Sequence, residues 1–291
     1  MFNKYQHIER YETDEVEGIE LGTCVVFPKL DGTNGSVWWD EELKAGSRNR
    51  ELSLENDNQG FMAYVSQDKR ILDYLKKYPT HRLFGEWLIP HTLKDYVDTA
   101  WRKFYIFDVV EDGRHLSYDE YKPFLDEFDL DYIAPIKEII NPTKETLYAT
   151  VEQNDYLCQP GKVGEGIVIK NYSFSNKYGR TTWAKIVRAE FKEKNKKLMG
   201  HPKTENKLIE HDIVEQFCTT AFIEKEYQKI VNEKNGWNSK YIPEFLGRLW
   251  HSFIVEESFN IIKAFKNPTI DFRKLNVILI NKVKLEKSEL F

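Results

Sequence analysis

The chain has 291 residues and a formal net charge of −5, which is long enough for one large domain with an appendage or for two domains. No apolar run approaches the length of a transmembrane helix and the N-terminus lacks the apolar core of a signal peptide, so we expect a cytoplasmic protein without membrane partners. The three cysteines are far apart and form no CxxC pair, which argues against a disulfide framework and a structural zinc site. The high content of Lys, Asn, Ile and Tyr hints at an AT-rich genome such as that of a phage.

Residues up to about 188 predict mixed strands and helices. Apolar, β-branched or aromatic runs at 23–27 and 35–39 stand on either side of a glycine-containing turn, as in a hairpin. Apolar residues at helical spacing between 61 and 75 predict a helix that ends at Pro79. Further strands are expected at 82–89, 103–110, 166–170 and 182–187. Together these elements predict an α+β domain of antiparallel sheets with flanking helices.

After about residue 200 the pattern changes to helical stripes. The first stripe runs from Ile213 to Phe222, the second begins after Pro243, and the third opens near Asp271. Such stripes are typical of the core of a small helical domain. We therefore expect the α+β domain to cover residues 1–200 and a small all-helical C-terminal domain to cover residues 201–291.

A Lys-x-Asp-Gly string starts at Lys29, between the first two predicted strands. Asp-Gly is a common hairpin signal, so this string alone is more often a tight turn with a solvated lysine. A lysine at a strand end beside a glycine can also project into a pocket. It then acts as a nucleophile if burial and nearby cations keep it neutral.

Further charged or aromatic strings follow in order, and each alone is more often structural. They are Arg48 in SRNR, Glu86 in FGEW, Phe107 and Asp108 in FYIFD, Glu165 and Lys170 at the ends of EGIVIK, and Lys185 in WAKIV. Arginine can donate paired hydrogen bonds to phosphate or ribose oxygens. An acid in an apolar strand needs a polar partner such as a ribose hydroxyl. An aromatic strand that ends in an acid suits stacking on a base.

In this order the strings resemble motifs I, Ia, III, IIIa, IV and V of the nucleotidyltransferase superfamily, which holds ATP-dependent DNA ligases, RNA ligases and mRNA capping enzymes. Within it the chain most resembles the RNA ligase 2 family, which includes the second RNA ligase of T-even bacteriophages and kinetoplastid editing ligases. Three features favour that family: the opening residues 2–5, Asn34 where an arginine is usual elsewhere, and a helical tail in place of an OB-fold. One departure is Val187, where family members often carry a second lysine; Arg188 and Lys192 are candidates for the missing charge.

The resemblance implies an ATP-dependent RNA ligase with ATP and Mg²⁺ (or Mn²⁺) as cofactors. It implies RNA as partner, as a nicked duplex or paired ends, and a monomer. The implied nucleotidyltransferase domain is residues 1–200. The implied roles are the nucleophile at Lys29, nucleotide contacts at Pro28, Asp31, Asn34, Arg48, Glu86, Phe107, Lys170 and Lys185, and metal contacts at Glu165 and Asp108.

Three alternatives stay open. A GTP-dependent mRNA capping guanylyltransferase shares Lys-x-Asp-Gly, and an ATP-dependent DNA ligase shares the ordered strings. A catalytically inert nucleic-acid-binding module would keep the fold, but we would expect it to have lost Lys29 or Glu165. The basic stretch at 161–210 holds twelve Lys/Arg against five Asp/Glu and is as often a solvated face as a phosphate contact.

Overall fold

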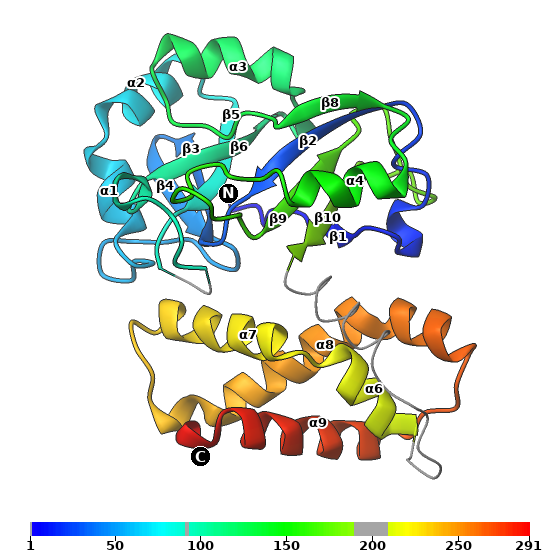
Figure 1. Cartoon of the computed structure of the whole chain (residues 1–291). Helices are drawn as coiled ribbons and strands as arrows, with labels where there is room; N and C mark the ends of the chain where they lie inside the picture. The colour runs from blue at the N-terminus through cyan, green and yellow to red at the C-terminus, as the bar shows by residue number, and fades with distance from the viewer. Residues whose placement is uncertain (1, 91–92, 189–208) are drawn as a thin grey trace.

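The computed structural model describes residues 2–90, 93–188 and 209–291 of the chain. The described residues form an α+β domain with two five-stranded sheets and a group of helices from the C-terminal part of the chain (Figure 1). The expected fold class is confirmed, whereas the boundary near residue 200 lies outside the described residues. In the described part of the chain, no helix is long and apolar enough to cross a membrane.

The first sheet, sheet A, has the strand order β1-β10-β9-β2-β8. Its strands are β1 (Glu9–Arg10), β10 (Ala184–Val187), β9 (Gly166–Lys170), β2 (Thr23–Lys29) and β8 (Lys137–Ile140). All neighbours are antiparallel except β1 and β10, because the N-terminal segment runs along the sheet edge in the direction of β10. Along β2, Val25 and Phe27 pack between the two sheets, whereas Cys24 and Val26 pack on the outer side with α4 (Lys144–Val151).

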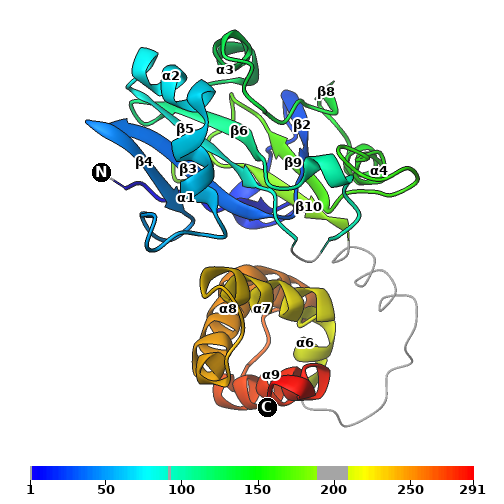
Figure 2. The ribbon, with the colours of Figure 1, turned by 90° about the vertical axis from the view of Figure 1, so that its left-hand side faces the viewer.

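The second sheet, sheet B, has the strand order β4-β3-β5-β6-β7. Its strands are β4 (Glu42–Ser47), β3 (Thr33–Asp40), β5 (His81–Trp87), β6 (Phe104–Glu111) and β7 (Arg114–His115). Its outer face is covered by α1 (Phe61–Gln67), α2 (Lys69–Lys77) and α3 (Tyr118–Glu127), whose apolar residues share one core with it (Figure 2). The inner faces of sheets A and B share a separate apolar layer.

The predicted hairpin between 23–27 and 35–39 is wrong, because β2 lies in sheet A and β3 lies in sheet B. The Asp-Gly pair serves a different purpose. A Cβ at Gly32 would lie 2.5 Å from the carbonyl oxygen of Trp87, so only glycine fits where the segment between β2 and β3 packs against the end of β5. This segment therefore carries the chain from sheet A to sheet B, and Lys29 lies where the segment begins.

The helix predicted between 61 and 75 is in fact two helices, α1 and α2. They are split at Asp68, whose side chain accepts a hydrogen bond from the backbone N–H of Arg70 and caps α2. The stripe from Ile213 to Phe222 is divided in the same way by the capping residue Thr219. In both places a polar residue inside an apolar stripe starts a new helix.

The C-terminal helices bury a core of their own. They are α6 (Ile209–Phe217), α7 (Thr220–Glu233), α8 (Ile242–Phe265) and α9 (Phe272–Glu286). In both views α7 lies on the side next to the α+β domain and α9 on the far side (Figures 1 and 2). Polar contacts join the two parts: Arg10 of β1 lies 3.3 Å from Glu256 of α8, and the Gln59 side chain donates to the Asn232 carbonyl oxygen at 3.1 Å.

Candidate active site

Lys29 ends β2 on the face that looks toward sheet B, because it follows Val25 and Phe27 at a spacing of two. Its strand position pairs with Gly166, which brings Glu165 beside it. The Lys29 ammonium nitrogen lies 2.5 Å from Glu165 Oε2, and the two side chains are 19% and 13% exposed. Burial raises the pKa of Glu165, while the Lys29 ammonium opposes this shift. The amine thus has a shielded proton acceptor in contact with it.

The backbone around Glu165 is fixed by close packing. A Cβ at Gly166 would lie 2.0 Å from the carbonyl oxygen of Ile186, so only glycine lets β9 approach β10 this closely. The buried Asn154 side chain donates to the Gly166 carbonyl oxygen at 2.6 Å. Sequence reasoning missed Asn154, since a lone asparagine in a loop gives no local signal of this role.

Glu86 faces the same space from sheet B. Its carboxylate accepts a hydrogen bond from the backbone N–H of Gly32 at 2.9 Å, and Asn34 stands directly opposite it across the β3–β5 pair. Burial raises the pKa of Glu86 to about 7 against the pull of the Lys29 ammonium. Two acidic side chains, one from each sheet, therefore stand near one lysine.

Asp31 holds the link between the sheets in place. Its buried carboxylate accepts a hydrogen bond from the backbone N–H of Leu93, and its own backbone N–H donates to the Tyr96 hydroxyl at 2.9 Å. Pro28, which precedes the lysine, is buried and pairs with Ile167 of β9. These contacts position the Lys29 backbone from both sides.

Cationic groups gather on the same face of sheet A. Lys185 of β10 is 7% exposed and pairs with Val168, so it shares the inner face with Lys29. Arg48 lies after β4, with Nη2 3.3 Å from Nδ1 of His7. Burial, together with the Lys185 and Arg48 cations, lowers the pKa of His7 to about 3. Sequence reasoning missed His7, which the parallel strand β1 brings to this place.

Lys170 and Asp108 form a buried ion pair between the sheets. Lys170 Nζ lies 2.8 Å from Asp108 Oδ1 and donates to the Phe107 carbonyl oxygen at 2.6 Å. The other Asp108 oxygen accepts from the Tyr5 hydroxyl and from the Trp183 indole N–H. Burial works to raise the pKa of Asp108, but the Lys170 ammonium and His115 outweigh it and hold the pKa at about 2.

This pair argues against two of the expected roles. Both Asp108 oxygens already have partners in the protein and the residue is 0% exposed, so the expected metal contact does not fit this arrangement. Lys170 is 2% exposed and its ammonium is held by Asp108 Oδ1 and the Phe107 carbonyl oxygen, so the expected phosphate contact does not fit this arrangement either. The pair instead ties sheet A to sheet B.

Phe107 sits at a β-bulge. Phe84 pairs with Asp108 and Gly85 pairs with Ile106, so Phe107 has no partner across the β5–β6 ladder. Its ring lies 5.1 Å from the ring of Tyr5, measured between centroids. Phe107 follows Tyr105 at a spacing of two and faces the same layer between the sheets, and the extra residue of the bulge lets the next residue, Asp108, face that layer as well.

The charge missing at Val187 is not replaced by the next residue. The Arg188 guanidinium pairs with Glu152, with Nη2 3.0 Å from Oε2, and Val187 itself is buried. The other expected candidate, Lys192, lies outside the described residues.

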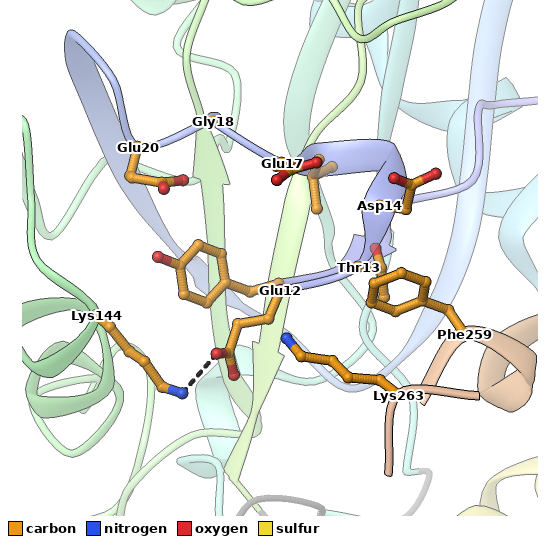
Figure 3. A pocket seen from close by; sticks show the side chains of 11 residues that line it. Glu12, Thr13, Asp14, Glu17, Gly18, Glu20, Lys144, Phe259 and Lys263 are labelled. Atoms are coloured by element: carbon orange, nitrogen blue, oxygen red, sulfur yellow. Dashed lines mark hydrogen bonds and ion pairs between the residues drawn. The ribbon is translucent and has the colours of Figure 1, made fainter. Parts of the chain in front are cut away.

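A cavity of about 340 Å³ lies away from these residues (Figure 3). It is lined by the acidic segment after β1 and by Phe259 and Lys263 of α8, and Lys144 pairs with Glu12 at its edge. None of the candidate residues above lines this cavity, which belongs to the contact between the two parts of the chain.

Comparison with known proteins gives two positive findings. The RNA ligase family model matches residues 22–187, which is more than half of the chain. Solved structures of Naegleria gruberi RNA ligase share the fold. One with PPi has a TM-score of 0.53 at 19% identity, and a variant with AMP and Mn has a TM-score of 0.52 at 19% identity. The matches cover 67% and 66% of this chain, but only 58% of each of those chains. Comparison with curated proteins finds no match.

Proposed function

The chain belongs to the RNA ligase family, and on this premise we propose that it is an ATP-dependent RNA ligase that joins 5′-phosphate and 3′-hydroxyl ends. One observation carries the proposal. The Lys29 amine points into the space between the sheets in contact with Glu165, with Glu86 near it and Lys185 on the same face of sheet A. A shielded amine with a proton acceptor and cations close by suits attack on a phosphate.

Three steps follow. The Lys29 nitrogen attacks the α-phosphorus of ATP, the bond to the β-phosphate oxygen breaks, and pyrophosphate leaves while the amine proton passes to water. The 5′-phosphate of RNA then attacks the same phosphorus and receives AMP. Finally a 3′-hydroxyl attacks the activated 5′ end, AMP leaves, and the strand is sealed.

We propose specific roles for the residues around Lys29. Glu86 binds a ribose hydroxyl, with Asn34 opposite it, and Lys185 and Arg48 contact phosphate or sugar oxygens. Asp31 shapes the loop. The Phe107 ring, which faces the layer between the sheets, stacks on adenine, and the Pro28 carbonyl oxygen accepts a hydrogen bond from the adenine amino group. Lys170 and Asp108 support the site through their ion pair instead of touching the nucleotide.

The carboxylates at this centre fit a divalent metal. Mg²⁺ is usually held by one or two carboxylates together with substrate phosphates and water. That agrees with the described residues, where no group of three or more His, Cys, Asp or Glu side chains could hold a metal ion on its own. Glu165 is the proposed ligand, with Mg²⁺ or Mn²⁺ as the ion. When bound, the metal neutralises charge on the phosphates.

The first test is transfer of label to the protein. Incubation with α-labelled ATP should give a covalent adduct that survives denaturing electrophoresis, Lys29→Ala should abolish it, and the exposed control Lys162→Ala should keep it. An adduct with labelled GTP alone would favour a capping guanylyltransferase instead. A Lys29→Ala protein that still seals RNA would contradict the mechanism.

The second test is a ligation panel with nicked RNA, nicked DNA, hybrids and single strands. We propose a nicked duplex or paired RNA ends as the preferred substrate. Sealing of an all-DNA nick as fast as one ending in RNA would favour a DNA ligase. The monomeric state, the cytoplasmic location and the phage origin stay predictions from the sequence.

A further inference from the structure

The N-terminal segment runs from sheet B to sheet A. The Tyr5 hydroxyl donates to the buried carboxylate of Asp108, which belongs to sheet B. The Glu9 backbone N–H donates to the Trp183 carbonyl oxygen at 3.0 Å, where β1 joins sheet A. His7 lies between these two anchored positions, so its backbone is held from both sides.

Arg48 leaves sheet B beside residues of the candidate active site. Ser47, the last residue of β4, pairs with Gly35 of β3. The residue before Gly35, Asn34, stands opposite Glu86 of β5. Because β3 and β4 are antiparallel, the residue after Ser47 starts at the end of the sheet where Asn34 lies. Arg48 therefore begins in the row of sheet B that holds the proposed ribose contact.

The imidazole of His7 contacts the guanidinium of Arg48. Arg48 Nη2 lies 3.3 Å from His7 Nδ1, and His7 Nε2 lies 3.8 Å from Oε2 of Glu9. A guanidinium only donates hydrogen bonds, so Nδ1 carries the lone pair and the ring proton belongs on Nε2, the nitrogen that faces the Glu9 carboxylate. Burial, together with the Lys185 and Arg48 cations, lowers the pKa of His7 to about 3, which keeps the ring neutral and able to accept.

On the basis of the proposed function, we propose that His7 is a positioning residue of the ligase, which holds the Arg48 guanidinium for contact with a phosphate or sugar oxygen of the nucleotide. An arginine side chain loses rotamer freedom when it binds a ligand, and a fixed acceptor removes part of that freedom beforehand. The guanidinium has five N–H donors, so a contact at one nitrogen leaves donors for the substrate. Because the imidazole is neutral, it orients Arg48 without cancelling the positive charge that attracts a phosphate, as a carboxylate partner would.

Nitrogen NMR of the full chain with ¹⁵N-labelled histidine tests the contact without any reaction. We expect the His7 ring, assigned by comparison with His7→Asn, to be neutral at pH 7 with its proton on Nε2. Arg48→Ala should shift the Nδ1 signal of His7, whereas Arg273→Ala, an exposed position on α9, should leave it unchanged. A charged ring, a proton on Nδ1, or an Nδ1 signal that does not respond to Arg48→Ala would overturn the proposal.

Adduct formation from α-labelled ATP tests the positioning role. His7→Ala should lower kcat/KM for the adduct by about tenfold or more, the size expected for a lost hydrogen bond to a charged group. His7→Asn should recover most of this loss, because its amide oxygen can accept a hydrogen bond near the position of Nδ1. His251→Ala, an exposed control on α8, should change kcat/KM less than twofold. Urea unfolding of each variant separates loss of the fold from loss of positioning.

A double-mutant cycle shows whether His7 acts through Arg48. In an Arg48→Ala background, His7→Ala should lower kcat/KM by less than a further twofold, because the group that His7 holds is already gone. An equal loss in both backgrounds, or normal adduct formation by a folded His7→Ala protein, would overturn the proposal. Absence of any adduct in the wild-type protein would instead refute the proposed function, while the histidine spectra would still decide the contact with Arg48.

Discussion

The protonation of Glu86 should make the stability of the protein depend on pH, because burial favours the neutral acid. Its proposed role, in contrast, requires a carboxylate that accepts a hydrogen bond from a ribose hydroxyl. Its pKa is about 7 in the folded protein, against an ordinary value of 4.5. Between these values the folded state binds a proton that the unfolded chain has released. Stability from this group is therefore fully present below pH 4.5 and is lost as the pH rises through 7.

The size of the effect follows from that difference. A shift from 4.5 to about 7 corresponds to at most about 3 kcal/mol, at roughly 1.4 kcal/mol for each pKa unit. Glu86→Gln removes the ionisation and keeps an oxygen for the Gly32 backbone N–H. The free energy of unfolding of the variant, relative to wild type, should rise by up to about 3 kcal/mol between pH 4.5 and pH 8. Adduct formation should fall, because the glutamine binds a ribose hydroxyl less strongly.

Urea unfolding at pH 5, 6, 7 and 8 measures this difference, and the comparison with wild type removes the contributions of other titrating groups such as His7. Glu138→Gln, an exposed carboxylate on β8, serves as the matched control and should show no such pH trend. A difference between Glu86→Gln and wild type that is the same at all four pH values would refute the reasoning.

Three further predictions follow from contacts between elements. Asp108→Asn leaves the Lys170 ammonium buried without a counter-charge and should cost about 3–5 kcal/mol in urea unfolding, so a loss below 1 kcal/mol would count against the pair. Gly166→Ala places a Cβ 2.0 Å from a β10 carbonyl and should lower Tm and abolish adduct formation. In contrast, Gly247→Ala, which meets open space in α8, should be tolerated and gain up to about 1 kcal/mol. Arg10→Ala removes the ion pairs with α8 and should increase the radius of gyration in small-angle scattering; an unchanged radius would contradict this.

The strands were largely predictable because their signal is local. Alternation and β-branched content locate β5, β6, β9 and β10 to within a few residues of their observed bounds. The hairpin prediction failed at Gly32, because an Asp-Gly pair looks the same in a tight turn and in a link pressed against another strand. Asp68 could have been recognised as a cap inside the stripe from 61 to 75, but the apolar spacing across it suggested a continuous helix.

The sequence indicated which residue types form the candidate site, but it did not indicate where each of these residues lies in the fold. Lys29 contacts Glu165, and Glu86 lies near them, because β2, β9 and β5 come together in the fold, whereas the order of the strings indicated only a family resemblance. The resemblance implied a phosphate contact for Lys170, but the ion pair that buries its ammonium forms with Asp108 of the other sheet, which no local pattern indicates. The place of His7 depends on the two-residue parallel strand that follows it, and so short a strand leaves no local pattern in the sequence.

The ion pair between Asp108 and Lys170 also bears on how the two sheets find their alignment during folding. The partners come from different sheets and are 62 positions apart in the chain, so neither sheet alone can satisfy them. A slip of one residue in β6 or β9 would turn one charge to the opposite face and leave the other buried alone, at a cost of several kcal/mol. We therefore expect the pair to destabilise misaligned sheets during folding, in addition to joining the two sheets in the folded domain.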